Sequence, residues 1–219
     1  MKVKVLFIAY QFPPRGGPGV HRSLNFVKYL GENGYEPVVL TVKEEDIGKA
    51  GYSYDETLLQ QIPNDITIVR TPSYEPIRLI RFFMRMRIYR IIWFLFFPFF
   101  WEWSARWPRK TYSLAAKLIK EHNIKLVYTS SSPFSSLLIG KRLKEKLGVK
   151  WVADLRDPFT DAYAWRFPSK LHWFFCRKFE KRIFPIADRL IVNTPEVKRL
   201  YGERKLAPDE KIICLTNGF

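Results

Sequence analysis

The chain has 219 residues, which is enough for one sizeable α/β domain with its own hydrophobic core. A hydrophobic content of 47% excludes wholesale disorder, and two cysteines are too few for a disulfide framework. The formal net charge of +16 indicates an anionic partner and leaves open a membrane surface, a nucleic acid or a phosphorylated substrate.

Short apolar runs alternate with helical patterns along the chain. We expect strands at residues 3–9, 37–42, 65–71, 125–130, 150–154, 189–194 and 211–216. We expect a first helix that ends near Gly31 or Gly34, and further helices at 108–122, 133–147, 169–187 and 195–201. This alternation predicts an α/β fold, a Rossmann-like, doubly wound, mainly parallel sheet with helices on both faces. No repeat or low-complexity linker interrupts it, so we expect residues 1–219 to form a single domain.

A glycine-rich loop with Gly16, Gly17 and Gly19 follows the first expected strand and precedes the first helical pattern. Such a loop is typical of phosphate sites, because glycines let backbone N–H groups approach an anion and the helix N-terminus adds positive potential. His21 and Arg22 could also donate to a phosphate there. For the loop, the alternative is a tight turn that binds no ligand. For His21 and Arg22, the alternative is that both side chains are only solvated at the start of the helix. Arg22 stands where a dinucleotide fingerprint needs Gly or Ala, and no Walker motif follows.

Polar residues also follow the other expected strands. They are Ser131 and Ser132, then Asp154, Arg156 and Asp157, then Asn193. Because the carboxyl ends of parallel strands meet at one edge of the sheet, these residues predict a binding crevice there.

Asp154, Arg156 and Asp157 are the densest charged group at this edge. A carboxylate there could hydrogen-bond a sugar hydroxyl or act as a base, and Arg156 could hold a phosphate or orient the aspartates. The alternative is a structural Asp–Arg ion pair that fixes the loop. No His, Cys and carboxylate cluster has metal-ligand spacing, so we expect no metal site.

Residues 77–110 form an insert of unusual composition, with twelve aromatic residues and eight Lys or Arg against one acid, Glu102. Its apolar run, 91–101, is shorter than the roughly 20 residues that span a bilayer. We therefore expect it to lie in a membrane interface, with Arg81 and Arg85 at anionic headgroups and aromatic side chains in the upper acyl region. The aromatic side chains that we expect to contact lipid are Trp93, Phe97 and Trp101.

The composition of the insert leaves two alternatives to membrane contact. Its aromatic residues could instead pack on the sheet of the domain or on a partner domain. Nucleic acid is disfavoured as a partner, because the segment is too apolar for a solvated groove and carries no recognisable module.

The cysteines and the N-terminus indicate the compartment. Cys176 falls in an expected helix and Cys214 in an expected strand, and both are interpreted as reduced core residues. The chain begins directly with a strand and shows no signal peptide. Together with the insert, this predicts a cytoplasmic protein associated peripherally with the inner face of the plasma membrane.

Five stretches, in this order, resemble the N-terminal half of family 4 glycosyltransferases of the two-domain GT-B fold, of the kind that builds bacterial surface polysaccharides. They are residues 12–17, 128–135, 151–159, 191–195 and 215–219. The resemblance implies an acceptor-side domain here and a C-terminal domain that binds a nucleotide-sugar donor. It implies transfer with retention to a lipid-linked or polysaccharide acceptor, without a metal or other cofactor.

The resemblance also implies roles for individual residues. Gly16 and Gly17, and less directly Gly19, would approach the donor diphosphate together with His21 and Arg22. Asp154, Arg156 and Asp157 would lie near the acceptor hydroxyl and the transferred sugar. The remaining polar residues of the edge, Ser131, Ser132 and Asn193, would lie on the acceptor side.

The resemblance covers only half of the family's pattern, because the chain stops where members continue into the donor domain with its paired glutamates. Glu36 and Glu44 share the spacing of that pair but lie in the wrong context. We therefore expect these 219 residues to be inactive alone. A non-catalytic, membrane-associated binding module with the same fold is the alternative, and a Rossmann-type oxidoreductase is a third reading that Arg22 disfavours.

Overall fold

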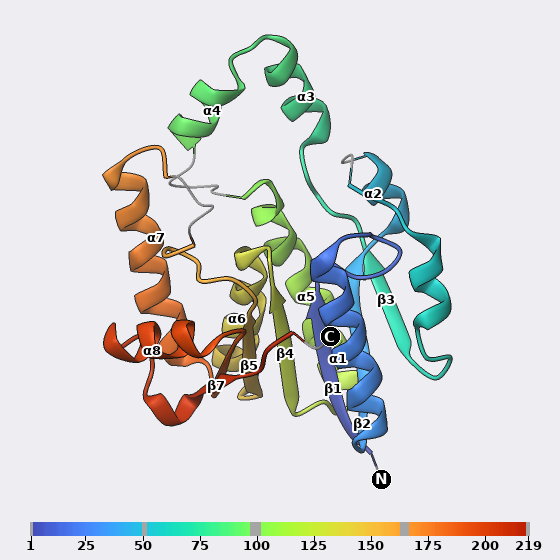
Figure 1. Cartoon of the computed structure of the whole chain (residues 1–219). Coiled ribbons are helices and arrows are strands. Elements are labelled where there is room, and N and C mark those ends of the chain that lie inside the picture. Colours follow the sequence, from blue (N-terminus) through green and yellow to red (C-terminus); the bar gives the residue numbers. More distant parts are fainter. Residues whose placement is uncertain (1, 50–51, 97–101, 163–166, 218–219) are drawn as a thin grey trace.

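The computed structural model describes residues 2–49, 52–96, 102–162 and 167–217 (Figure 1). Within these ranges the chain forms one seven-stranded, wholly parallel sheet in the order β3-β2-β1-β4-β5-β6-β7. The strands are β1 Val3–Ala9, β2 Tyr35–Val42, β3 Thr67–Thr71, β4 Leu126–Ser131, β5 Lys150–Leu155, β6 Arg189–Val192 and β7 Ile212–Cys214. The predicted doubly wound α/β fold is confirmed, and the strand order reverses between β1 and β4.

Alternate residues of the central strand β1 face opposite sides of the sheet. Leu6 and Ile8 belong to one buried cluster, whereas Val5 and Phe7 belong to another. Because side chains alternate along a strand, an apolar run like this one needs cover on both faces. That requirement explains why helices flank the sheet on both sides.

The helices that cover the two faces are unequal in number. Helix α1 (Pro18–Glu32) and a 3₁₀ turn at Glu56–Gln61 cover one face. The other face is covered by α5 (Trp107–Glu121), α6 (Leu137–Leu147), α7 (Lys170–Ile183) and α8 (Pro195–Glu203). Pro18 starts α1, Gly148 ends α6 in the left-handed region (φ 69°), and Thr194 caps α8 by accepting from the Val197 amide.

Several boundaries differ from the expectation. The short helix α2 (Glu44–Lys49) and the turn at Glu56–Gln61 were not expected, and β7 ends at Cys214 rather than at residue 216. The segments expected as helices at 133–147 and 169–187 each include a 3₁₀ turn, at Phe134–Ser136 and Phe184–Ile186. Cys176 and Cys214 lie in the predicted helix and strand, and both are free thiols.

The insert forms an arch above the carboxyl edge of the sheet, built from α3 (Ile77–Arg85) and α4 (Tyr89–Phe96) (Figure 1). No residue of α3 is buried, and Phe82 and Ile91 are 55% and 61% exposed. Arg81 and Arg85 are also exposed, whereas Trp93 packs partly against the core. Phe97 and Trp101 lie outside the described residues. None of the helices in the described ranges is long and apolar enough to cross a membrane.

The arch is fixed to the domain at its second end. The His172 ring of α7 makes hydrogen bonds with the Phe94 carbonyl (2.8 Å) and the Ser169 hydroxyl (2.7 Å). The Glu102 carboxylate accepts from the amides of Phe134 and Ser135, both at 2.7 Å. The insert is also shorter than expected, because Trp107 already belongs to α5 and is fully buried.

Candidate functional site

A cavity of about 490 Å³ opens at the carboxyl edge of the sheet, where the strand order reverses. We call it the switch-point cavity. It draws on the loops that follow β1, β4, β5, β6 and β7, as expected for a doubly wound sheet. Its lining residues are Gln11, Arg15, Gly16, Gly17, Pro18, Gly19, Arg22, Ser132, Arg156, Asp157, Asn193 and Asn217. Most of the residues singled out from the sequence therefore meet in one place.

Asp154 is bound by Arg22, which comes from helix α1 on the other side of the switch point. Arg22 Nη2 lies 2.8 Å from Asp154 Oδ1, and Arg22 Nε lies 3.1 Å from Asp154 Oδ2. The two side chains are 4% and 1% exposed. Burial disfavours the charged guanidinium, but hydrogen bonding and charge pairing with Asp154 outweigh it and raise the pKa of Arg22. The charged groups of Arg22 and Asp154 are therefore bound to each other and are not free to bind a ligand in the cavity.

Arg22 also reaches the end of the chain that is described, because its Nη1 donates to Asn217 Oδ1 at 2.9 Å. On the other side of Asp154, the Ser130 hydroxyl lies 3.4 Å from Oδ2. Tyr128, two residues before Ser130 on β4, is buried, and this burial raises the pKa of its phenol. The Asp154 carboxylate is therefore buried and already hydrogen-bonded within the protein.

Arg156, in the loop after β5, donates to backbone carbonyls at the end of β4 and at the start of α1. Its Nη2 donates to Ser132 O at 2.8 Å, its Nε to Ser131 O and its Nη1 to Gly19 O. Nη1 also lies 3.2 Å from Gln11 Oε1. Burial lowers the pKa of Arg156, although nearby aspartates act in the opposite direction. The partner of Asp154 is thus Arg22, and Arg156 holds the loops together.

The approach of α1 to Arg156 explains Gly19. A Cβ at this position would overlap the Arg156 guanidinium and the Gln11 side-chain amide. Gly16 faces a similar limit, because a Cβ there would lie 2.7 Å from Ser53 Oγ, and its own amide donates to Ser53 O. Gly17, at φ 109°, has open space around it. Two of the three glycines are therefore required by close packing, and Gly17 by its positive φ.

The remaining predicted residues divide between open and closed positions. Asp157 is exposed and lines the cavity. Asn193 Oδ1 and Ser131 Oγ are buried and have no hydrogen-bond partner among the described residues. His21 does not line the switch-point cavity. It lines a second cavity of about 640 Å³ between α1 and the chain after β7, which shares Arg22 and Asn217 with the first.

Sequence reasoning missed Gln11 and Arg15 as lining residues, whereas Asn217, which follows the last expected strand, was expected at this edge. Gln11 and Arg15 flank the same loop as the glycines, so their position directly after a buried strand was the available signal. No group of three or more potential metal ligands occurs in the described parts of the chain.

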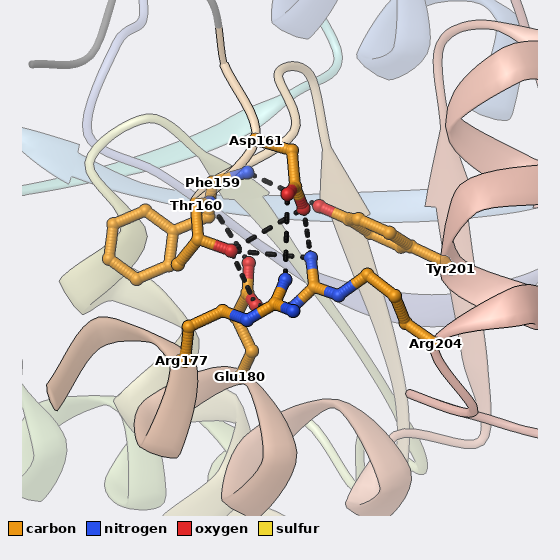
Figure 2. A network of polar contacts seen from close by, with 7 residues as sticks. All are labelled: Phe159, Thr160, Asp161, Arg177, Glu180, Tyr201 and Arg204. Atoms are coloured by element: carbon orange, nitrogen blue, oxygen red, sulfur yellow. Dashed lines mark hydrogen bonds and ion pairs between the residues drawn. The ribbon is translucent and has the colours of Figure 1, made fainter. Parts of the chain in front are cut away.

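The loop that follows β5 is held from behind by a second polar network, drawn in Figure 2. The fully buried Glu180 of α7 accepts from the Thr160 amide (3.0 Å) and hydroxyl (2.7 Å). Arg204 makes ion pairs with both Glu180 and Asp161, and Arg177 lies 3.4 Å from Asp161. Burial raises the pKa of Glu180, although Arg204 and Thr160 oppose the shift. The network ties the cavity's β5 loop to α7 and to the chain after α8.

Comparisons with known proteins identify the family and the fold. The sequence model of Glycosyltransferase Family 4 matches residues 16–219, and no curated protein matches the sequence. Among solved structures, a glycosyltransferase from Rickettsia africae ESF-5 matches with 18% identity and a TM-score of 0.54 over 99% of this chain and 43% of its own. Anabaena Alr3699/HepE in complex with UDP and glucose matches with 14% identity and a TM-score of 0.54 over 99% and 45%.

The same fold also occurs in UDP-GlcNAc 2-epimerases. The enzyme from Neisseria meningitidis, bound to UDP-GlcNAc, matches with 9% identity and a TM-score of 0.53 over 97% of this chain and 45% of its own. Identities this low indicate the fold alone. The chain spans less than half the length of each of these structures.

Proposed function

We propose that this chain, which belongs to glycosyltransferase family 4, is the acceptor-side domain of an enzyme that transfers a sugar from a nucleotide-sugar donor. The acceptor is a lipid-linked glycan or polysaccharide in cell-surface glycan synthesis, and transfer retains the configuration at the anomeric carbon. The donor-binding domain lies outside these 219 residues, consistent with the 43–45% of the solved relatives that the chain covers.

The switch-point cavity is the observation that carries the proposal. It joins the glycine loop at the N-terminus of α1 to polar groups that follow four other strands, in a fold where ligands bind at this edge. Two similar structures hold UDP with glucose and UDP-GlcNAc, which supports a nucleotide-sugar as the donor. No metal or organic cofactor is part of the proposed reaction.

The contacts at the edge suggest how the predicted residues divide the work. Asp157 is open to the cavity, so it is the carboxylate that would bind or deprotonate the acceptor hydroxyl. Asp154 and Arg156 act as positioning residues, because their polar atoms are occupied by Arg22 and by loop carbonyls. Gly17 lines the cavity at the N-terminus of α1, where the donor diphosphate would approach, and Ser132 and Asn193, which line the same cavity, would bind on the acceptor side.

We further propose that the protein works in the cytoplasm at the inner face of the plasma membrane, through the α3–α4 arch. The exposed Phe82, Ile91 and Leu95, next to the exposed Arg81 and Arg85, support this. Exposed apolar side chains together with exposed arginines fit an anionic bilayer, since lipid covers the apolar groups while headgroups meet the arginines.

The test is a transfer assay on two proteins, the 219-residue chain and the protein extended past residue 219 as its gene encodes it. Both are given a panel of radiolabelled nucleotide sugars and membranes that contain prenyl-linked acceptors. We expect transfer only by the extended protein, and an anomeric configuration in the product that matches the donor. Transfer by the 219-residue chain alone, an inverted product, or a stop codon directly after residue 219 without a partner protein would contradict the proposal.

A further inference from the structure

Three arginines line the switch-point cavity, and they differ in what already binds them. Arg22 is committed to the Asp154 carboxylate, and Arg156 to three backbone carbonyls. Arg15 has no carboxylate within ion-pair distance among the residues that the structure describes. Its guanidinium carbon instead lies over the Tyr52 ring, 3.5 Å from the ring centroid.

Stacking leaves the binding edge of Arg15 available. A guanidinium is planar, and its N–H groups point outward in that plane, so a contact with its face occupies none of them. An arginine held in this way keeps its fork of donors for an anion and loses little side-chain entropy on binding. Arg15 is therefore the cavity arginine whose charge the protein itself has not neutralised.

The ring beneath Arg15 is firmly held. The Tyr52 hydroxyl donates to Glu75 Oε1 at 3.0 Å, and the Tyr10 hydroxyl donates to the same oxygen at 2.6 Å. Burial, and then the charge of Glu75, raises the pKa of Tyr52 to about 12, so its hydroxyl remains a donor at neutral pH. Tyr10 in turn packs edge-on against the buried Trp107, with centroids 5.1 Å apart.

The backbone around Arg15 is fixed as well. Arg15 forms an antiparallel bridge with Tyr54, and the amides of Gly16 and Asp55 donate to Ser53 O (2.9 Å) and Pro14 O (2.8 Å). The loop is thus tied to the 53–55 segment before any ligand arrives. This is the preorganisation that an anion site needs, because a fixed donor pays no ordering cost on binding.

A second feature next to Arg15 favours negative charge. Helix α1 has 15 residues, Gly17 at its N-cap supplies no side-chain hydrogen bond, and its first turn contains no acid. The positive end of the helix therefore has no compensating carboxylate on its own first turn. Gly17 and Arg15 line the same cavity, so the helix end and the guanidinium act on one space.

We propose that Arg15 is a binding residue for the diphosphate of the ligand, a contact that complements the N-terminus of α1. The inference rests on the proposed function, which supplies two sources of this chemistry, the donor nucleotide diphosphate and the prenyl diphosphate of a lipid-linked acceptor. Tyr52 is its positioning residue.

Binding of three probes to the 219-residue chain, measured by calorimetry at low salt, tests the proposal. Inorganic pyrophosphate probes the shared chemistry, UDP the nucleotide source and farnesyl diphosphate in detergent the lipid source. We expect Arg15→Ala to weaken pyrophosphate binding about tenfold, and Arg15→Lys to weaken it less because the charge remains. Arg199→Ala removes an exposed arginine of α8 that pairs with Glu203, and we expect it to change binding less than twofold.

The organic probe that binds more tightly identifies which diphosphate the site takes, that of the donor nucleotide or that of the lipid-linked acceptor. Its binding must also be weakened by Arg15→Ala. Tyr52→Leu, which removes the platform, is expected to weaken pyrophosphate binding several-fold, whereas Tyr52→Phe keeps the ring and most of the affinity. Each variant is checked for an unchanged unfolding midpoint, so that a loss of affinity is not a loss of fold.

Three results would overturn the proposal: no binding of any probe at millimolar concentration, unchanged binding by Arg15→Ala, or an equal loss in Arg199→Ala. The last would indicate attraction by net charge rather than a site. These outcomes are independent of sugar transfer. Pyrophosphate can bind through Arg15 in a protein that transfers no sugar, and transfer can occur in one whose Arg15 is dispensable.

Discussion

The carboxyl edge of this domain carries two regions that differ in how their side chains are covered. Around the switch-point cavity, buried charges are paired within the protein, as Asp154 is with Arg22 and Arg156 is with loop carbonyls. On the α3–α4 arch, which lies above the same edge of the sheet (Figure 1), large apolar side chains such as Phe82 and Ile91 are exposed. The difference teaches that the cavity side is held by contacts within the domain, whereas the arch leaves apolar side chains exposed, as interaction surfaces do.

Breaking the buried pair should give the largest effect on stability. Arg22→Met leaves the Asp154 carboxylate buried without its counter-charge, which costs about 3–5 kcal/mol in other proteins. We expect a drop of that size in the free energy of unfolding from urea titrations. The double variant Arg22→Met with Asp154→Asn should recover part of it, because the orphaned charge is gone. A loss below about 1 kcal/mol in the single variant would show that the pair does not hold this edge together.

Two glycines of the same helix sharpen the comparison at the next level. Gly19→Ala would place a methyl group against Arg156 and Gln11, and we expect a cost of about 1–3 kcal/mol from overpacking. Gly31→Ala, in the same helix, meets open space and should stabilise the protein by about 0.5–1 kcal/mol. Thermal unfolding of both variants checks the pair, and equal shifts in the unfolding midpoint would contradict the close approach at Gly19.

The arch should respond in the opposite way, with lost binding and unchanged stability. Phe82→Ser combined with Leu95→Ser should change the free energy of unfolding by less than about 0.5 kcal/mol, because both side chains are exposed. Sedimentation with anionic vesicles should show binding weakened at least about tenfold, since each lost side chain removes an apolar contact with lipid. The matched control is Val3→Ser, which alters a side chain that is 53% exposed at the opposite edge of the sheet. Unchanged vesicle binding by the double variant, or an equal loss in the control, would remove the membrane role of the arch.

The smallest expected effect concerns Asp188, which accepts from the Trp151 amide and pairs with Lys144 away from both surfaces. It shows how much an ordinary polar contact contributes to stability in this protein. Partial burial acts to raise its pKa, but hydrogen bonds from Lys144 and the Trp151 amide, with Lys150 nearby, outweigh this and lower it. A lowered pKa means stability that is present above the unfolded-state value of about 3.9 and is lost as the pH falls through the folded-state value. We expect Asp188→Asn to cost about 1 kcal/mol at pH 7 and less at pH 2.

The readout for Asp188 is the free energy of unfolding measured by urea at the two pH values. A cost that is the same at both would mean that the hydrogen bond to Trp151 matters and the charge does not.

The fold was predictable because each strand except β3 contains at least three consecutive apolar residues, and each covering helix is long enough to show its own period. The six-residue helix α2, Glu44–Lys49, was missed because a segment so short and polar carries no periodic signal. Trp107 was placed with the insert because local composition resembles that of the arch. Only the tertiary structure shows that its indole donates to Thr71 in the core, at 2.8 Å.

The members of the site were predictable from strand ends, but their pairings were not. Adjacency suggested that Asp154 would pair with Arg156, two positions away, whereas its partner is Arg22, which is 132 residues distant in the chain. Strand β5 ends at Leu155, so Arg156 already lies in the loop, where the alternation of side chains along a strand no longer sets its direction. Arg15 was overlooked for a similar reason, since its stacking partner Tyr52 lies in a separate loop.

The most direct test of this account compares aspartate variants of the extended protein that transfers sugar, with Asp157 as the residue under test. Asp157→Asn should lower kcat at least about 100-fold, as expected for loss of a group that handles a proton, while leaving the unfolding midpoint unchanged. Asp65→Asn, an exposed aspartate far from the cavity, should leave both unchanged, and Asp154→Asn should lower the midpoint. If Asp157→Asn retained full transfer activity, the assignment of Asp157 as the open, reacting carboxylate of the cavity would be wrong.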